Sequence, residues 1–159
     1  MSSPVGELLL GASAGHLCFA GFGTKALQED FMHRATAVAV EDNPVLKLTA
    51  GELRQYFHGR CRHFTMPINY HDTPFRQAVW KEMQKISYGK TKSYADIAEK
   101  VGGRQKARAV GGAAHHNPLV IIIPCHRVIG SDGSLVGFGS GLAIKKKLLE
   151  LEGKIDYIK

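Results

Sequence analysis

Long apolar segments, tryptophan and cysteine are scarce in this chain of 159 residues, which contains one tryptophan and three cysteines. No apolar run approaches the roughly 20 residues that a membrane-spanning helix needs. The N-terminus also lacks a basic start followed by an apolar stretch, so we expect neither a membrane span nor a secretory signal. The cysteines are odd in number and show no metal spacing such as C-x-x-C, which fits free thiols in a reducing compartment. We therefore expect a cytoplasmic protein, or a nuclear one in a eukaryote.

Basic residues outnumber acidic ones, 21 against 14, so the formal net charge is +7. A positive balance favours polyanionic partners such as nucleic acids, although charge alone does not identify a partner. Hydrophobic residues make up 44% of the chain, which is enough to bury a core. The length is typical of one compact domain or of two small ones that share an interface.

The first 70 or so residues predict a small sheet with one or two helices. Two apolar stretches, residues 5–10 and 17–22, are separated by a small-residue turn and predict a β-hairpin. A helix is expected over residues 26–38, and a capping box at residues 49–52 predicts the start of another. Residues 64–70 have the composition of a further strand.

A second unit begins at Asp72, where Thr73 can cap a helix whose first residue is Pro74. Residues 93–96 form another capping box, which opens a short helix that a pair of glycines ends. A third helix is expected over residues 106–116. Two short helices joined by a glycine turn are typical of a helix-turn-helix.

The last part of the chain combines apolar stretches with a glycine-rich loop. Residues 120–123 are β-branched or apolar and predict a buried strand, whereas residues 130–141 contain five glycines and predict a loop. A last helix carries Ile144, Leu148 and Leu151 on one face.

Cys125 and His126 follow directly on the predicted strand and on Pro124, which stiffens the chain. A cysteine beside a histidine is a candidate activated nucleophile, because the reactive thiolate needs a nearby base or positive charge. Adjacent residues of a strand point to opposite faces, so these side chains can cooperate only if the chain turns here or a water bridges them. On the pair alone, a buried structural cysteine beside a surface histidine is the favoured interpretation.

The helix over residues 106–116 consists mostly of small residues, with Arg108 near its start and Gly111 and Gly112 in its middle. A glycine inside a helix costs about 1 kcal/mol relative to alanine, so close approach of the backbone to another surface must compensate. A major-groove reader would carry long polar side chains, whereas a face of small residues suits the narrower minor groove. Tight packing in the core explains the composition equally well.

Charged residues near the C-terminus allow more than one interpretation. Glu152 lies at the end of the last helix, where a negative charge is on the unfavourable side of the helix dipole. It is either solvated or held by a histidine. The lysines at positions 145–147 are interpreted as a solvated helix face, and Cys18 and Cys61 as packing residues.

Together these segments resemble one family, the 6-O-alkylguanine-DNA alkyltransferases, also called methylated-DNA–protein-cysteine methyltransferases. The most specific similarity is Asn117-Pro118 followed by the string IIIPCHRV over residues 121–128. Further similar segments extend over nearly the whole chain, at residues 3–6, 56–59, 75–80, 93–94, 107–111, 141–142, 148–149 and 152–153.

The resemblance implies a mixed α/β (α+β) fold with two domains. Residues 1–70 would form a small ribonuclease H-like domain of sheet and helix. Residues 71–159 would form a helical, winged-helix or helix-turn-helix-like domain that carries the DNA-binding and alkyl-acceptor sites. The implied function is direct reversal of DNA damage. A methyl or other alkyl group passes irreversibly from 6-O-alkylguanine, and also from 4-O-alkylthymine, to an internal cysteine, and no cofactor is needed.

The resemblance also implies roles for individual residues. Cys125 is the alkyl acceptor, His126 is the base that deprotonates it through a water, and Glu152 orients the histidine, as in a nucleophile–base–orienter triad. Tyr94 helps to rotate the nucleotide and gives a proton to the leaving guanine, and Asn117 braces the turn before the acceptor. The substrate-binding residues implied are Tyr94, Cys125, Val128, Phe138, Gly139 and Ser140.

The implied partner is double-stranded DNA, bound through the minor groove with the damaged base flipped out of the duplex. Arg108 would insert into the base stack and fill the vacated space. The other residues expected at DNA are Tyr94, Lys106, Ala107, Ala109, Gly111, Gly112, Ala114 and His115. We expect a monomer without a membrane partner, and the sequence leaves open whether molecules bind cooperatively along DNA.

Three features depart from those of relatives. Phe138 stands where many relatives carry tyrosine, so a hydroxyl is missing from the loop. His115 replaces a basic residue found in some relatives. Some relatives bind a structural zinc through N-terminal cysteines and histidines, but only Cys18 lies near that position here, so we expect no bound metal.

Three other functions remain alternatives. A damage-binding relative that does not repair would carry tryptophan at the acceptor position, where this chain has Cys125. A helix-turn-helix regulator would bind a specific duplex sequence without alkylation of a cysteine. A cysteine hydrolase would turn over and would need an oxyanion hole, which the sequence does not identify.

Overall fold

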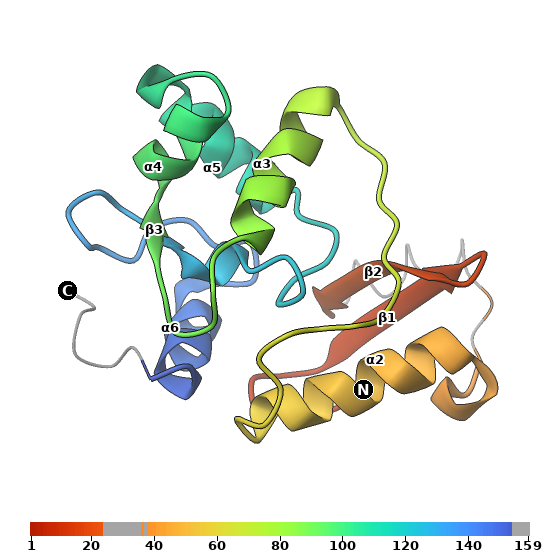
Figure 1. Cartoon of the computed structure of the whole chain (residues 1–159). Coiled ribbons are helices and arrows are strands. Elements are labelled where there is room, and N and C mark those ends of the chain that lie inside the picture. Colours follow the sequence, from red (N-terminus) through yellow and green to blue (C-terminus); the bar gives the residue numbers. More distant parts are fainter. Residues whose placement is uncertain (24–35, 37, 154–159) are drawn as a thin grey trace. The chain divides into compact units, whose positions relative to one another are not determined.

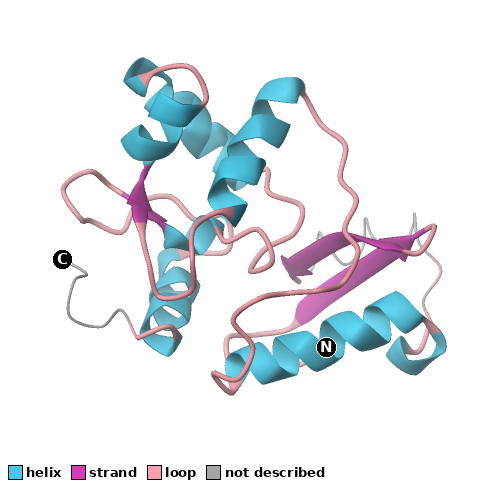
Figure 2. Ribbon diagram, viewed as in Figure 1, coloured by secondary structure: helices cyan, strands magenta, loops and turns pink. Residues whose placement is uncertain are grey.

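The computed structural model describes residues 1–23, 36 and 38–153. The fold is mixed α and β, as the resemblance implies, and it divides into two compact units, Met1–Tyr70 and His71–Lys159 (Figure 1, Figure 2). The helix expected over residues 26–38 lies outside the described residues, apart from Thr36 and Val38, which have no regular structure. Within the described part of the chain, no helix is long and apolar enough to cross a membrane.

The first unit contains the expected β-hairpin. β1 (Leu8–Ser13) pairs antiparallel with β2 (His16–Phe22), and the turn between them has positive φ angles, 48° at Ala14 and 78° at Gly15. Two left-handed residues give a turn whose twist matches that of the paired strands. The first strand starts later than expected because a turn that ends at Gly6 precedes it.

A helix, α2 (Pro44–Phe57), packs against both strands of this hairpin (Figure 1). It begins well before the capping box expected at Thr49, because Asn43 is the cap: its side chain accepts from two helical N–H groups, both at 3.1 Å. Thr49 lies inside the helix, where its hydroxyl donates to the carbonyl of Val45 at 2.7 Å. The 3-10 turn η1 (Val40–Asp42) precedes the cap.

Residues 64–70, which were expected to form a strand, contribute only an isolated parallel bridge between Leu17 and Ile68. Leu17 donates to the carbonyl of Pro67 at 2.8 Å and accepts from the N–H of Asn69 at 2.9 Å. Pro67 has no N–H with which to extend a ladder, which explains why the pairing stops. Fully buried apolar residues of this unit include Leu8, Leu17, Ala50, Leu53 and Tyr56.

The second unit is built on helices that contact one another (Figure 1), namely α3 (Pro74–Gln84), α4 (Tyr94–Lys100) and α5 (Ala107–His115). The first two start as predicted: the Thr73 side chain caps α3, and Ser93 and Asp96 form the capping box of α4. A 3-10 turn, η2 (Arg104–Lys106), follows the glycine pair and leads into α5.

Residues 120–123 form a tight turn and not the buried strand that their composition predicts. The N–H of Ile123 donates to the carbonyl of Leu119 at 2.7 Å, and Ile121 has a φ of 77°. Ile121 and Ile123 are buried, so the apolar composition here reflects burial and not pairing. The strands of this unit are instead short and parallel, β3 (Lys92–Ser93) beside β4 (Val128–Ile129).

The chain then runs through the expected glycine-rich loop into α6 (Leu142–Leu151), which ends before Gly153 as predicted. One expectation for this helix is wrong. Lys145 was assigned to a solvated face, but it is 0% exposed and shares the buried face with Leu148 and Leu149. The other lysines of the run, at positions 146 and 147, are exposed as expected.

The position of the α2 cap yields a stability prediction. Asn43→Ala removes the acceptor of two helical N–H groups and should lower the free energy of unfolding by about 1 kcal/mol. Asn43→Ser keeps a capping oxygen and should therefore retain most of the wild-type stability. Thr49→Val, which removes a hydroxyl from the helix interior, should have a smaller effect. Urea denaturation measures all three variants. A larger loss for Thr49→Val than for Asn43→Ala would contradict the assigned start of the helix.

Candidate active site

Cys125 is the first residue of a 3-10 turn, η3 (Cys125–Arg127), and is 4% exposed. The side-chain amide of Asn117 donates to Cys125 Sγ at 3.1 Å and to the carbonyl of Ile123 at 2.8 Å. The amide oxygen of Asn117 accepts from the N–H of Leu119 at 3.0 Å. Asn117 therefore closes the turn with both ends of its amide and places a hydrogen-bond donor on the sulfur.

The backbone turns at Cys125 and His126, as it must if the side chains of these adjacent residues are to cooperate. Because η3 is helical and not extended, Cys125 and His126 do not alternate across a strand. The thiol borders a cavity, while His126 is 0% exposed in the interior. The positive φ of Ile121 shortly before the turn is a conformation that β-branched residues rarely adopt, so the surrounding structure must hold it.

The carboxylate of Glu152 is buried, and both of its oxygens have hydrogen-bond partners. Glu152 Oε1 lies 2.9 Å from His126 Nε2 and 2.9 Å from Nη2 of Arg127. Its Oε2 accepts from Arg127 Nε at 2.9 Å and from the N–H of Gly89 at 3.0 Å. Arg127 also donates to the carbonyl of Ile86 at 2.6 Å. The bidentate guanidinium thus leaves the carboxylate a single orientation.

The charges in this cluster decide which nitrogen of His126 is basic. Burial by itself raises the pKa of Glu152, but the hydrogen bonds and charges of His126 and Arg127 outweigh it and lower the pKa to about 2. An ionised carboxylate only accepts hydrogen bonds, so Nε2 carries the ring proton and Nδ1 is the basic nitrogen. Burial lowers the pKa of His126 in spite of the carboxylate, so the ring is neutral at neutral pH.

The thiol of Cys125 needs such a base. Burial raises the pKa of Cys125, while the hydrogen bond from Asn117 and the charge of Lys145 act in the opposite direction. A thiol with a raised pKa is protonated near neutral pH, and the thiolate is the reactive form. The neutral imidazole of the adjacent His126 is the candidate for this base.

The cavity beside the thiol has a volume of about 390 Å³, within the range of small-molecule sites. Its walls are mostly apolar, with the hydroxyl of Tyr94 as a polar group. That hydroxyl donates to the carbonyls of Val136 and Gly137 at 3.0 and 3.1 Å. Burial and the nearby Cys125 raise the pKa of Tyr94 to about 12, so the hydroxyl stays protonated and can act as a donor.

The small residues of α5 divide between two faces. Val110 and Ala113 are buried, and the carbonyl of Ala113 accepts from the indole N–H of Trp80 at 2.8 Å. Arg108 is exposed, and a side chain added at Gly112 would meet nothing within 4 Å. Core packing therefore explains one face of the helix, and an open face of small residues remains.

The structure brings many of the residues singled out in the sequence to the cavity. Those that line it are Tyr94, Ala107, Arg108, Gly111, Ala114, His115, Cys125 and Phe138, joined by Val136 and Gly137, which were not singled out. Those outside the lining are Lys106, Ala109, Gly112, Asn117, His126, Val128, Gly139, Ser140 and Glu152. Of the second group, Asn117 donates to the thiol, and His126 and Glu152 are joined in the buried network of the adjacent turn.

Two buried cations of the site, Arg127 and Lys145, were not predicted from the sequence. A buried carboxylate needs a charged partner, so the adjacency of Arg127 to the cysteine–histidine pair was a usable signal. Lys145 precedes Leu148, Leu149 and Glu152 by the spacings of one helical face. This periodicity places the lysine on the buried side of α6.

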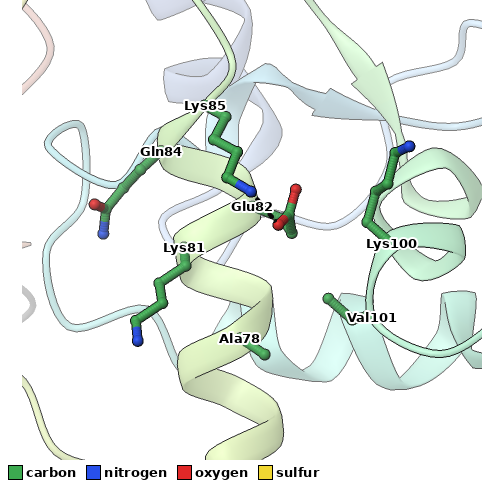
Figure 3. A pocket seen from close by; sticks show the side chains of 7 residues that line it. All are labelled: Ala78, Lys81, Glu82, Gln84, Lys85, Lys100 and Val101. Carbon is green, nitrogen blue, oxygen red and sulfur yellow. Dashed lines mark hydrogen bonds and ion pairs between the residues drawn. The ribbon is translucent and has the colours of Figure 1, made fainter.

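A second cavity, of about 520 Å³, lies between α3 and α4 (Figure 3). Figure 3 shows Lys81, Lys85 and Lys100 around it, with Lys85 paired to Glu82. Its lining residues include no cysteine, histidine or hydroxyl group. The cavity beside Cys125 is therefore the candidate active site.

Two family models match this chain. The one described as the ribonuclease-like domain of 6-O-methylguanine DNA methyltransferase matches residues 1–70. The one described as the DNA binding domain of 6-O-methylguanine DNA methyltransferase matches residues 74–154. All residues of the cavity and of the buried network lie within the second match.

Individual proteins are similar over most of the chain. The inducible methylated-DNA–protein-cysteine methyltransferase of Bacillus subtilis is 42% identical over 140 residues, which cover 86% of this chain and 78% of the relative. The crystal structure of Mycobacterium tuberculosis O6-methylguanine methyltransferase has a TM-score of 0.85 and 37% identity, covering 96% of this chain and 89% of the other. That of Mycobacterium tuberculosis OGT in complex with DNA has a TM-score of 0.84 and 38% identity, with coverage of 96% and 89%.

The buried carboxylate predicts a particular acid dependence of stability. The pKa of Glu152 falls from an ordinary value of 4.5 to about 2 in the folded protein. Its ionised form therefore contributes stability above pH 4.5 that is lost as the pH falls towards 2, and this shift corresponds to about 3 kcal/mol. Urea unfolding across this window should show a flatter pH dependence for Glu152→Gln, which is also less stable at neutral pH. Glu150→Gln, on the same helix, is the control. Equal slopes for wild type and Glu152→Gln would contradict the prediction.

Proposed function

The chain belongs to the 6-O-methylguanine DNA methyltransferase family, and we propose on this premise that Cys125 is its alkyl acceptor. The protein is a DNA-repair transferase that moves a methyl or other alkyl group from O6 of guanine in DNA to one of its own cysteines. The observation that carries the assignment to Cys125 is its position on the cavity, with Asn117 on its sulfur. Cys18 and Cys61 belong to the other unit.

The transfer is a displacement at carbon. Cys125 Sγ attacks the alkyl carbon from the side opposite O6, the carbon–sulfur bond forms as the carbon–oxygen bond breaks, and the bonding electrons go to the guanine. The thiol proton passes through a water to His126 Nδ1, and Tyr94 gives a proton to the leaving guanine. Tyr94 then recovers a proton from His126 through solvent, so the net exchange is an alkyl group for the thiol hydrogen. Nothing in the site re-ionises a thioether, so each molecule acts once, without a cofactor.

Glu152 and Arg127 support the catalytic base, His126. Glu152 holds Nε2 of His126, which leaves Nδ1 as the nitrogen that accepts the thiol proton in this proposal. Its low pKa means that it stabilises the imidazolium without taking up a proton itself. Arg127 keeps the carboxylate ionised and in place.

The flipped base would occupy the cavity. The main-chain carbonyls of Cys125 and Val128 accept from the guanine amino group. Val128 already accepts from Lys145, and its carbonyl has a second lone pair for the base. The loop residues Phe138, Gly139 and Ser140 close over the ring, and 4-O-alkylthymine, a smaller base, fits the same site.

Binding to DNA uses the open face of α5. Its small residues approach the minor groove closely, and Arg108 fills the space that the flipped base leaves. The residues that contact DNA in this proposal are Tyr94, Lys106, Ala107, Arg108, Ala109, Gly111, Gly112, Ala114 and His115. The phosphate contacts of the basic residues make the affinity fall with rising salt concentration.

The acceptor and the DNA-binding face lie in one unit of one chain, residues 71–159, so the protein works as a monomer, while residues 1–70 form a separate α/β domain. A single-use thiol must stay reduced until it meets a lesion. We therefore place the protein in a reducing compartment that holds DNA, the bacterial cytoplasm or a eukaryotic nucleus.

Intact-protein mass spectrometry tests the assigned acceptor. After mixing with an oligomer that contains 6-O-methylguanine, the protein should gain one methyl group per molecule, saturating at one equivalent, and Cys125→Ser should gain none. Cys61→Ser is the control and should react like wild type. Binding without a gain in mass would indicate a damage-binding protein, and repeated turnover would indicate a hydrolase. Selective binding of undamaged duplex alone would indicate a regulator.

A second test addresses base flipping. Arg108→Ala should slow methyl transfer from duplex DNA roughly tenfold or more, because it removes the group that compensates for unstacking. Transfer from a single-stranded oligomer should change much less. Arg104→Ala, which alters an exposed arginine nearby, is the matched control. Equal slowing on both substrates would contradict the role assigned to Arg108.

A further inference from the structure

Lys145 is a buried cation with all of its donors in use. Its Nζ donates to the main-chain carbonyls of Val128 at 2.6 Å, Val136 at 2.7 Å and Gly137 at 3.2 Å. An ammonium has three donors and no acceptor, so these carbonyls match its full capacity. A buried charge is tolerated only when it is satisfied in this way, which explains how α6 can carry a lysine that is 0% exposed.

The three carbonyls come from two different segments. Val128 starts β4, directly after the turn that carries Cys125. Val136 and Gly137 belong to the glycine-rich loop and line the cavity. Lys145 therefore ties the loop at the cavity to the segment that holds the acceptor.

Tyr94 shares two of these carbonyls with the lysine. Its hydroxyl donates to Val136 and Gly137, and Lys145 Nζ lies 5.7 Å from the centroid of its ring. When Tyr94 turns its hydroxyl to a bound base, it gives up both bonds to the loop. Lys145 is the donor that still holds the loop carbonyls at that moment.

We propose that Lys145 is a positioning residue for alkyl transfer: its ammonium holds the carbonyls of the glycine-rich loop in place while the Tyr94 hydroxyl donates to the bound base. Deprotonation of Lys145 then releases the loop. The inference rests on the proposed function, because that function assigns the base to the cavity and the proton to Tyr94.

The pKa of Lys145 lies in a pH range in which the protein can be assayed. Burial lowers the pKa of Lys145 to about 8, whereas Cys125 raises it. The ionisable groups that face it are Cys125 and His126 on η3 and Tyr94 on α4. Burial raises the pKa of Tyr94 to about 12 and raises that of Cys125 above its ordinary value of 9.0. Burial lowers the pKa of His126 below its ordinary value of 6.5. Of these groups, Lys145 is therefore the one that titrates near pH 8. Below this pH the ammonium donates to all three carbonyls, and above it the neutral amine has one hydrogen fewer.

Two lysine variants and two readouts test the proposal. Lys145→Met keeps a long apolar stem but removes the charge and the donors, and Lys147→Met alters an exposed position of the same helix. One readout is amide hydrogen exchange of residues 130–141, corrected for intrinsic rates, between pH 6.5 and 9. The other is the single-turnover rate constant for methyl transfer from 6-O-methylguanine in DNA.

We expect the wild-type loop to lose protection as the pH rises through about 8. In Lys145→Met the loop should exchange rapidly at every pH, with the rest of the second unit unchanged. Its methyl transfer should be about tenfold to a hundredfold slower, as for other misplacements of a substrate-contacting group, yet still reach one methyl per protein. Lys147→Met should match wild type in both readouts.

The proposal would be overturned if Lys145→Met showed the same loop exchange and the same transfer rate as the wild type. It would also be overturned if exchange in Lys145→Met became faster throughout the second unit, because that result indicates a structural role only. A wild-type loop without a step near pH 8 would overturn the pH dependence. If wild type gains no methyl group at all, the proposed function fails. The exchange comparison then still decides whether Lys145 holds the loop.

Discussion

The buried carboxylate of Glu152 joins segments of the second unit that are far apart in the sequence. It binds His126 and Arg127 of the acceptor turn and the N–H of Gly89, which follows α3. Arg127 extends the connection to the carbonyl of Ile86. Removal of any one charge would leave its partner buried and uncompensated, at a cost of about 3–5 kcal/mol. The position of the turn that carries the thiol therefore depends on this carboxylate.

The same interaction determines the chemistry available to the site. An ionised Glu152 fixes the tautomer of His126, and burial keeps that ring neutral and able to accept a proton. The low dielectric that keeps the histidine neutral also raises the pKa of the Cys125 thiol, so burial favours the neutral form of both groups before the thiol proton is transferred. Arg127 and Lys145 are buried cations of this site: Arg127 pairs with the carboxylate of Glu152, and Lys145 donates to carbonyls of β4 and of the loop.

Elements whose signals are local were predicted well. Thr73 and Ser93 cap the helices that follow them, because a cap and the N–H groups that it satisfies lie within one turn. The same spacing misled at Thr49, where a true cap at Asn43 had already started the helix. The predicted strand at residues 120–123 failed for another reason: β-branched residues signal burial, whereas pairing needs a partner strand elsewhere in the chain.

By itself, the sequence singled out the candidate residues for the chemistry, because the segments around Cys125 and His126 and the small-residue helix with Arg108 together resemble one family. Only the tertiary structure decided which charges are buried and what they contact. Lys145 and its neighbour Lys146 are the same residue type in the same helix, yet one is 0% exposed and the other is in solvent. The difference depends on carbonyls supplied by β4 and by the loop, and burial of a charge is a property of the segments that surround it, not of the residue.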